Sequence, residues 1–263
     1  MLTVHLQRMK TSILRAISML LLLFALAHNA NSQKLDPIAT DRPDQTESPF
    51  IVPQQYFQFE IGFIHEKVNQ NEINQTYPNC LAKYGLTKKT ELRLILDLGN
   101  TRSFGKNNSG LNPVTIGFKT NLLEEKGIIP TTSFIGHLTI PTLASQDKKA
   151  IYYAPSFRFN MQHTLSDRST LSYNLGSEWD GFTPEPTFIY TLATGFSITE
   201  SFGSYVELYG FAPQKQSARH SWDAGFTYLI NNNVQLDIHA GTAITKNAPD
   251  YFIGCGISFR FKK

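Results

Sequence analysis

The chain has 263 residues, of which 41% are hydrophobic and 12% aromatic, and its formal net charge is +3. Arg8, Lys10 and Arg15 account for this excess of positive charge, so the rest of the chain is formally neutral and indicates no nucleic-acid partner. The two cysteines, Cys80 and Cys255, are too few for a disulfide scaffold and lack metal-ligand spacing, so we expect two free thiols.

Residues 1–32 are predicted to be a cleaved secretory signal peptide. The three basic residues precede an apolar run at 16–27, and the small residues Ala30 and Ser32 follow it. This run is too short to span a bilayer comfortably, and polar residues follow it at once, which argues against an uncleaved anchor helix. We expect cleavage after Ser32. No later segment is apolar for long enough to form a transmembrane helix.

A polar segment, residues 33–54, separates the predicted signal from the first predicted strand. Its central part, ATDRPDQTESP at 39–49, combines acidic and basic residues with two prolines, which stiffen a chain into extended or turn conformations. We expect this periplasmic segment to fold back and close the lower mouth of a barrel, because a simple linker needs no such mixture of charges. Four residues form its predicted anchor: Asp41, Arg42, Asp44 and Glu47.

From residue 55 onward, apolar and polar residues alternate with a period of two, which places them on opposite faces of β-strands. Each run is close to the roughly 9–11 residues that a tilted strand needs to cross a membrane. Twelve strands are predicted, near residues 55–66, 75–86, 90–99, 111–121, 131–140, 151–163, 169–180, 186–199, 203–212, 219–230, 233–244 and 251–261.

The links between these runs alternate between short turns and longer polar loops. The segment NLLEEKGIIPT at 121–131 is the one long link at a position where the alternation calls for a short turn. This rhythm is typical of an outer-membrane barrel with short periplasmic turns and longer extracellular loops, whereas a soluble β-sandwich has no reason to keep it. The chain is therefore predicted to be all-β, with residues 55–263 forming one transmembrane up-and-down antiparallel β-barrel of about 12 strands.

The polar faces of the predicted strands carry charges of both signs, as expected for a wet lumen. The same alternation also points Lys119 and Asp180 inward. The competing interpretation is that most of these charges pair across the barrel into a structural network, because an unpartnered charge in a narrow lumen is costly. Nine residues are predicted to line the lumen and set its selectivity: Glu60, Arg93, Asp97, Arg158, Glu178, Glu207, Asp223, Asp237 and Arg260.

Catalysis has weak support in the sequence. His220, Ser221 and Asp223 have the residue types of a hydrolase, but adjacent residues of a strand point to opposite faces, and no Gly-x-Ser-x-Gly elbow is present. An outer-membrane enzyme of the lipase or protease type therefore remains only a weaker alternative, and we expect no enzyme. The histidines have no paired spacing, so neither a metal site nor another cofactor is predicted. Gly254 and Gly256 are expected to relieve crowding inside the barrel.

Six segments carry a family resemblance: DRPDQTESP at 41–49, QYFQFEIGF at 55–63, LAKYGLTKKTELRL at 81–94, GFKTNLLEE at 117–125, SYVELYGF at 204–211 and GCGISFRF at 254–261. With them the chain resembles the MetA-like family of the phenol meta-cleavage pathway, the MetA-pathway of phenol degradation. The resemblance implies an outer-membrane barrel that moves small molecules, aromatic or hydrophobic ones among them.

The predicted function is passive passage of small molecules across the outer membrane of a Gram-negative-type bacterium, after export by the signal peptide. Outer-membrane lipid and a small-molecule solute are the expected partners. The alternation up to Phe261 resembles the terminal strand that the barrel assembly machinery receives, so this machinery is a third expected partner. The main alternative is a structural or surface-interaction barrel with a filled lumen.

Overall fold

The structure is a computed structural model that describes residues 35–263, so the predicted signal peptide lies outside the described residues. Within residues 35–263, no helix has both the length and the hydropathy that crossing a membrane requires. Both cysteines are free thiols, as expected.

Antiparallel β-structure dominates the described chain, which also has one short 3₁₀ helix, η1 (Gln146–Lys148). Thirteen strands form a single sheet. Their bounds are β1 (Tyr56–Asn69), β2 (Glu72–Gly85), β3 (Thr90–Ser103), β4 (Lys106–Leu111), β5 (Val114–Leu123), β6 (Thr131–Ile140), β7 (Ala154–Ser166), β8 (Ser169–Glu178), β9 (Thr187–Ser197), β10 (Phe202–Pro213), β11 (Arg219–Asn231), β12 (Val234–Ala243) and β13 (Tyr251–Lys262).

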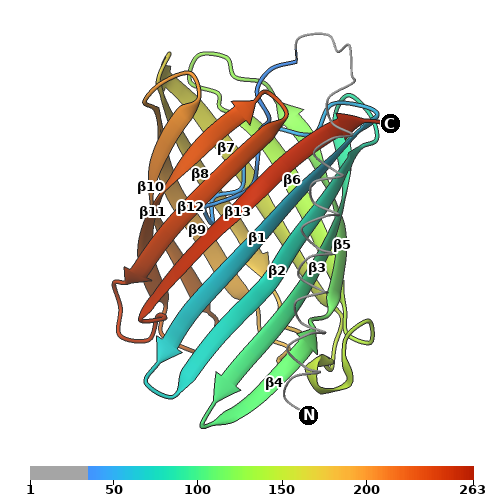
Figure 1. Cartoon of the computed structure of the whole chain (residues 1–263), viewed down its shortest axis with the longest axis vertical. Coiled ribbons are helices and arrows are strands. Elements are labelled where there is room, and N and C mark those ends of the chain that lie inside the picture. The colour runs from blue at the N-terminus through green and yellow to red at the C-terminus, as the bar shows by residue number, and fades with distance from the viewer. Residues whose placement is uncertain (1–34) are drawn as a thin grey trace, which may run out of the picture. The chain divides into compact units, whose positions relative to one another are not determined.

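The sheet closes on itself because β13 pairs with β1 along almost its full length, from Tyr56 opposite Lys262 to Lys67 opposite Tyr251. Strand β3 pairs with β2 on one side and β5 on the other, while β4 forms only a hairpin with the end of β3. Twelve strands therefore make the closed barrel and β4 is an addition to it (Figure 1). The predicted twelve-stranded antiparallel barrel is confirmed.

Two predicted loops are wrong in detail. The polar stretch expected to link the first two strands belongs mostly to β1 and β2, which meet at residues 70–71. The predicted loop at 100–110 likewise contains the end of β3 and most of β4. The reason is physical: a hairpin that extends beyond an apolar band has polar residues on both faces, so no alternation marks it in the sequence.

The two faces of the barrel wall invert the usual arrangement of a globular protein. On β3, Leu92 and Leu98 point outward and are 45% and 47% exposed, whereas Glu91 and Arg93 point inward and are buried. Exposed apolar side chains cover the outer face of the other strands as well. Water would make such a continuous apolar surface costly, and its size is typical of a surface in contact with another apolar phase.

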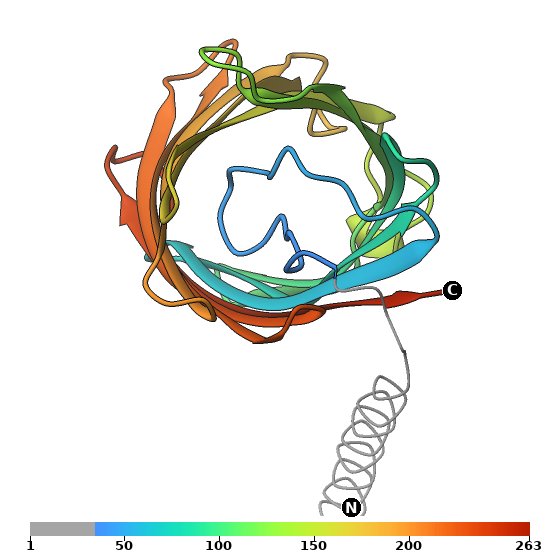
Figure 2. The same cartoon turned by 90° about the horizontal axis from the view of Figure 1, so that it is seen from above.

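Short links gather at one end of the barrel, which we call the turn end. They are residues 86–89, 124–130, 167–168, 198–201 and 232–233. Both Tyr56, where β1 begins, and Lys263 lie at this end, and the Lys263 amide donates to the Gln55 carbonyl oxygen at 3.0 Å. Seen along the barrel, the chain that precedes β1 loops through the inside of the ring (Figure 2). This segment positions the candidate site.

Candidate functional site: a plug inside the lumen

Residues 38–54, which we call the plug, run through the lumen without regular secondary structure. The plug begins at the turn end, where the Ile38 amide donates to the Asn232 carbonyl oxygen at 2.9 Å, and it ends at Gln55, whose amide donates to Gly85 at 2.8 Å. Ile38 and Val52 are almost completely buried. The two ends of the plug are thus fixed at the mouth from which the barrel starts.

Side chains of the barrel wall accept hydrogen bonds from the plug backbone. The amides of Asp41 and Arg42 both donate to Glu60 Oε2, at 2.9 and 3.0 Å. The Glu47 amide donates to Asn174 Oδ1 at 2.7 Å, and the Val52 amide donates to a Glu91 carboxylate oxygen at 2.7 Å. Buried backbone N–H groups need partners, and here wall side chains supply what a helix or sheet would otherwise provide.

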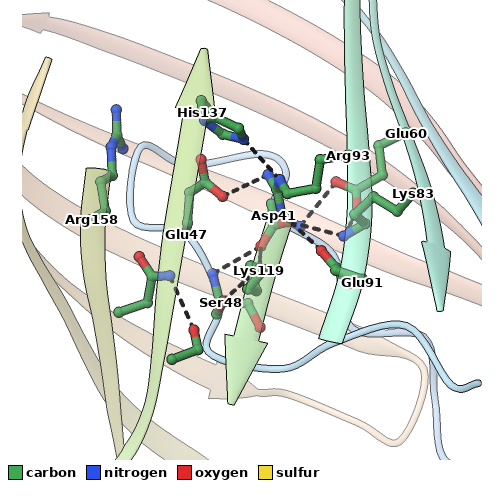
Figure 3. A network of polar contacts seen from close by, with 12 residues as sticks. Asp41, Glu47, Ser48, Glu60, Lys83, Glu91, Arg93, Lys119, His137 and Arg158 are labelled. Carbon is green, nitrogen blue, oxygen red and sulfur yellow. Dashed lines mark hydrogen bonds and ion pairs between the residues drawn. The ribbon is translucent and has the colours of Figure 1, made fainter. Parts of the chain in front are cut away.

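Asp41 lies at the centre of a cationic cluster (Figure 3). Its Oδ2 atom accepts from Lys83 Nζ at 2.9 Å and from Arg93 Nη1 at 2.8 Å, and its Oδ1 atom accepts from Lys119 Nζ at 2.6 Å. Burial alone would raise the pKa of Asp41, but attraction to Lys119, Lys83 and Arg93 outweighs burial and holds this pKa well below its usual range. Three wall strands are therefore tied to one plug carboxylate.

Arg93 extends this network to further acids. Its Nη2 atom pairs with Glu47 Oε2 at 2.8 Å, its Nη1 atom pairs with Glu91 Oε1 at 3.0 Å, and its Nε atom donates to His137 at 3.0 Å. Burial would raise the pKa of Glu47, but the Arg93 guanidinium brings it below its ordinary value. The Glu60 carboxylate in turn pairs with Lys83. Every charge on this side of the lumen has a partner of opposite sign.

Arg42 enters a slot in the neighbouring part of the wall, formed by β1, β13 and β12. Its Nη2 and Nε atoms donate to the two carboxylate oxygens of Asp237 at 2.9 and 3.2 Å, a bidentate pair that fixes position as well as charge. Gly62 on β1 and Gly256 on β13 form the floor of the slot and face each other across the strands. A Cβ atom at Gly62 would lie 1.9 Å from Arg42 Nη1, and one at Gly256 would lie 2.5 Å from its Nε.

The third contact region between plug and wall has acidic side chains without basic partners. Glu207 on β10 accepts from the Gln45 amide at 2.8 Å and from the Thr46 hydroxyl. Asp223 on β11 lies directly opposite Glu207 in the register, and Asp44 of the plug faces both. Burial raises the pKa of Asp44 well above its usual value, and repulsion from Glu207 and Asp223 raises it further. Among residues 35–263, no basic side chain forms an ion pair with these three carboxylates.

Two cavities lie on either side of the plug. The larger, of about 370 Å³, extends from the plug toward the end opposite the turns, where Glu66, Asn74 and Phe252 line it. The smaller, of about 240 Å³, extends toward the turn end, where it is lined by residues of the short links and strand ends. Both cavities are lined by the same three plug residues, Arg42, Pro43 and Asp44. These three residues are therefore the part of the plug that the two cavities share.

The structure brings most, though not all, of the predicted site residues to the plug. Glu60, Arg93, Glu207 and Asp237 bond to it directly, and Arg158 Nη1 donates to the Gln45 carbonyl oxygen at 3.0 Å. All four predicted anchor residues lie in the lumen, but within the described part of the chain Asp44 has no partner of opposite charge.

Other predicted lumen residues lie away from the plug. Asp97 accepts from Asn79 at 2.8 Å, Glu178 lies 3.8 Å from Arg158, and Arg260 donates to Asn233 Oδ1 at 2.8 Å near the turn end. The expectation that Asp180 points inward is wrong: β8 ends at Glu178, and Asp180 lies in an exposed loop, where it accepts from the amides of residues 182 and 183.

Sequence reasoning missed two residues that complete the cluster, Lys83 and Glu91. Glu91 lies two residues before Arg93 in an alternating strand, so the signal for its inward position was present. The alternation around Lys83 is weak, and only its pairing with Arg93 in the register reveals its position.

The residues considered for catalysis do not assemble. His220 lies on the outer face, where its Nε2 atom and the Tyr190 hydroxyl are 2.6 Å apart. Ser221 and Asp223 are buried in the lumen on the other face of the same strand. A nucleophile and its base must come within hydrogen-bond reach of each other, and these side chains are separated by the barrel wall.

Comparison with solved structures places this fold among outer-membrane barrels. An outer membrane channel from Pseudomonas putida F1 matches with a TM-score of 0.66 and 13% identity, over 84% of this chain and 99% of that one. The KdgM porin in complex with disordered oligogalacturonate matches with a TM-score of 0.54 and 8% identity, over 77% and 99%. The NanC porin matches with a TM-score of 0.53 and 6% identity, over 77% and 98%. At these identities the likeness concerns the fold.

Sequence comparison gives one further result. No curated protein matches the chain. The model of the family described as "Putative MetA-pathway of phenol degradation" matches residues 40–261, which include most of the plug, all of β1 to β12, and β13 as far as Phe261.

Proposed function

Since the chain belongs to the MetA-pathway of phenol degradation family, we propose that it is an outer-membrane channel through which small molecules pass passively. The apolar outer face of the wall supports contact with lipid, and the buried polar face supports an aqueous lumen. The fold shared with an outer membrane channel and with porins is consistent with this role.

The observation that carries the proposal is the pair of cavities that meet at Arg42, Pro43 and Asp44. A barrel that served only as a scaffold has no need of space on both sides of its filling. In our proposal, a solute enters one cavity, passes the plug at these three residues and leaves through the other cavity. The plug then acts as a fixed constriction, because its buried ion pairs hold it against the wall.

The solute is expected to be small, since the plug fills the middle of the lumen. The larger cavity combines charged residues with Tyr209, Phe252 and aliphatic side chains. This lining suits molecules that have both an apolar and a polar part, and aromatic compounds are among them. The family description, which refers to phenol degradation, agrees with this class but does not select one compound.

A filled, non-conducting barrel is the second candidate. The observation in its favour is the density of buried ion pairs between plug and wall, since such a network can also close a lumen permanently. In that case the outer loops or the lipid-facing surface would carry the function. The two candidates differ in one measurable property, which is solute flux through the folded barrel.

Solute uptake by proteoliposomes distinguishes the channel from the filled, non-conducting barrel. The purified barrel is reconstituted without its signal peptide, and the entry of uncharged solutes of increasing size is followed by light scattering. We expect small solutes to enter and larger ones to be excluded, with a higher size limit after deletion of residues 39–49. Uptake by the deletion variant alone would favour the filled barrel, and no uptake by either folded form would overturn the channel.

The proposal includes export by the N-terminal signal, insertion by the barrel assembly machinery and residence in the outer membrane. The register that joins β13 to β1 supports the role of the last strand in closing the barrel during insertion. Fractionation of cells that express the full chain, followed by N-terminal sequencing of the mature protein, tests cleavage after Ser32 and the membrane location together.

A further inference from the structure

The two sides of the constriction differ in how their charges are balanced. Lys83, Arg93 and Lys119 all pair with Asp41, and Arg42 pairs with Asp237. Asp44, Glu207 and Asp223 have no such partner among residues 35–263. The carboxyl groups without a basic partner therefore lie on the side of β10 and β11.

A second observation indicates that this acidic cluster is incomplete. Asp223 is 1% exposed and its Oδ1 atom has no hydrogen-bond partner. Tyr205, which is 7% exposed, directs its hydroxyl group at Asp223 and also lies near Asp44 and Glu207. Buried polar atoms are normally satisfied, so the open Asp223 oxygen points to a ligand that supplies positive charge or a donor.

Asp44 connects the cluster to both cavities. Asp44 lines each of them, Tyr205 lines the smaller one, and Glu207 and Asp223 lie behind the plug. A cation that passes from one cavity to the other therefore has to pass Asp44. The described residues contain no group of three His, Cys, Asp or Glu side chains in metal-chelating geometry, so a passing cation would be held by charge and not by a coordination cage.

We propose that Asp44, Glu207 and Asp223 form a binding step for small monovalent cations at the constriction and make the passage cation-selective. This inference rests on the proposed channel function, because selectivity requires flux past the plug. Rings and clusters of acidic side chains give cation preference elsewhere in channels by the same electrostatic means. The basic residues around Asp41 and the plug residue Arg42 do not cancel this preference, since Asp41, Glu47, Glu60 and Glu91 together balance Lys83, Arg93 and Lys119, and Asp237 balances Arg42.

Two measurements on the purified full-length mature barrel test the binding step. The first is the reversal potential in a planar bilayer under a potassium chloride gradient, for the wild type and for Asp44→Asn and Asp223→Asn. Asp223 accepts no hydrogen bond from the plug backbone, and Asp44 accepts one only from its own amide, which an asparagine oxygen can also accept, so both variants keep the plug's contacts with the wall. Each is expected to lower the ratio of potassium to chloride permeability by about fivefold, the effect of one unit charge at about 4 Å in a water-like dielectric. Asp97→Asn removes a lumen acid away from the plug and should leave the ratio nearly unchanged.

The second measurement does not need conduction. Crystals of the wild type and of Asp44→Asn are soaked in rubidium chloride, and we expect an anomalous peak beside the three carboxylates in the wild type alone. Conduction with an unchanged permeability ratio and no rubidium peak would show that the cluster holds protons only, and would overturn the inference. If no form conducts, the proposed channel fails, while the rubidium peak still decides whether the site binds a cation.

Discussion

Asp41 places one carboxylate within 2.6–2.9 Å of three cationic side chains on β2, β3 and β5. Asp41→Asn keeps the size of the side chain but leaves three buried cations with fewer partners. Breaking a buried pair in this way costs about 3–5 kcal/mol. We expect the substitution to weaken docking of the plug and to leave the closed wall intact. Cleavage of the plug by a protease should therefore speed up markedly, while the barrel still resists heat and detergent.

Glu178→Gln is the matched control for this prediction, since Glu178 pairs with Arg158 only at 3.8 Å and lies outside the Asp41 cluster. It should leave cleavage of the plug unchanged. Equal protease resistance of Asp41→Asn and wild type would show that the plug is held by its backbone contacts and not by the Asp41 cluster.

The raised pKa of Asp44 predicts how plug docking depends on pH. Its pKa in the docked state is raised, so the docked plug holds a proton that the released plug loses, and docking weakens as pH rises above the ordinary value of 3.8. Asp41 and Glu47 have lowered pKa values, so their contribution is present above about 3.8 and 4.5 and is lost only as pH falls below these values. Near neutral pH, the change of plug docking with pH therefore comes from Asp44.

The groups that act on Asp44 are Glu207 on β10, Asp223 on β11 and Asp41 within the plug, with Tyr205 on β10 nearby. Hydrogen exchange of the plug amides, corrected for intrinsic rates, should show easier opening as pH rises from about 5 to 8. Asp44→Asn should flatten this slope. A slope of the same size in Asp44→Asn would assign the effect to the wall acids alone.

Residue positions were predictable where alternation was clean, and residue partners were not. The period of two places Glu60, Glu207 and Asp237 inward, and the structure has them there. Alternation fixes the face on which a side chain lies but contains no information on which strand lies across the lumen. That Asp41 meets Lys119 and that Asp44 meets only acids depends on the path of a segment with no periodic pattern at all.

At the scale of elements, β1 and β13 are shaped to receive the plug. Gly62 and Gly256 leave the space that the Arg42 guanidinium occupies, which agrees with the expectation that glycines of the last strand relieve crowding inside the barrel. Gly62→Ala would place a Cβ atom 1.9 Å from Arg42 Nη1 and should displace this side chain from Asp237. We expect the plug to loosen, with faster cleavage and higher conductance, while strand pairing is retained.

Gly195→Ala is the appropriate comparison, because an added Cβ there meets only the Thr170 hydroxyl. Cleavage of the plug should stay near the wild-type rate in that variant. If Gly62→Ala behaves in the same way as Gly195→Ala, Arg42 is not held by the slot and the account of this anchor is wrong.

Some strands show a clear alternation of apolar and polar residues in the sequence, and others do not. Strands inside the apolar band alternate clearly and were predicted within a few residues, for example β9 (Thr187–Ser197) and β12 (Val234–Ala243). The extension of β1 and β2 to residues 70–71 and the hairpin of β4 carry no alternation, because both of their faces are polar. Cross-strand hydrogen bonding, which the sequence pattern does not report, holds these parts together.

The whole molecule combines an apolar exterior with a lumen that its own N-terminal segment crosses. The number of strands agrees with the sequence prediction, and a barrel of this size lies between small barrels filled by their own side chains and open porins. The plug determines whether the lumen resembles that of a filled barrel or that of an open porin. Its attachment by ion pairs to several strands, together with cavities above and below it, corresponds to a narrow and permanent constriction.

Single-channel conductance in a planar bilayer, measured for the wild-type barrel and for the variant that lacks residues 39–49, tests whether the plug is the constriction. Resistance to heat and detergent first establishes that both forms are folded. We predict a small, steady conductance for the wild type and a clearly larger one for the deletion variant, because the constriction is gone. No conductance in either folded form, or the same conductance in both, would contradict the account.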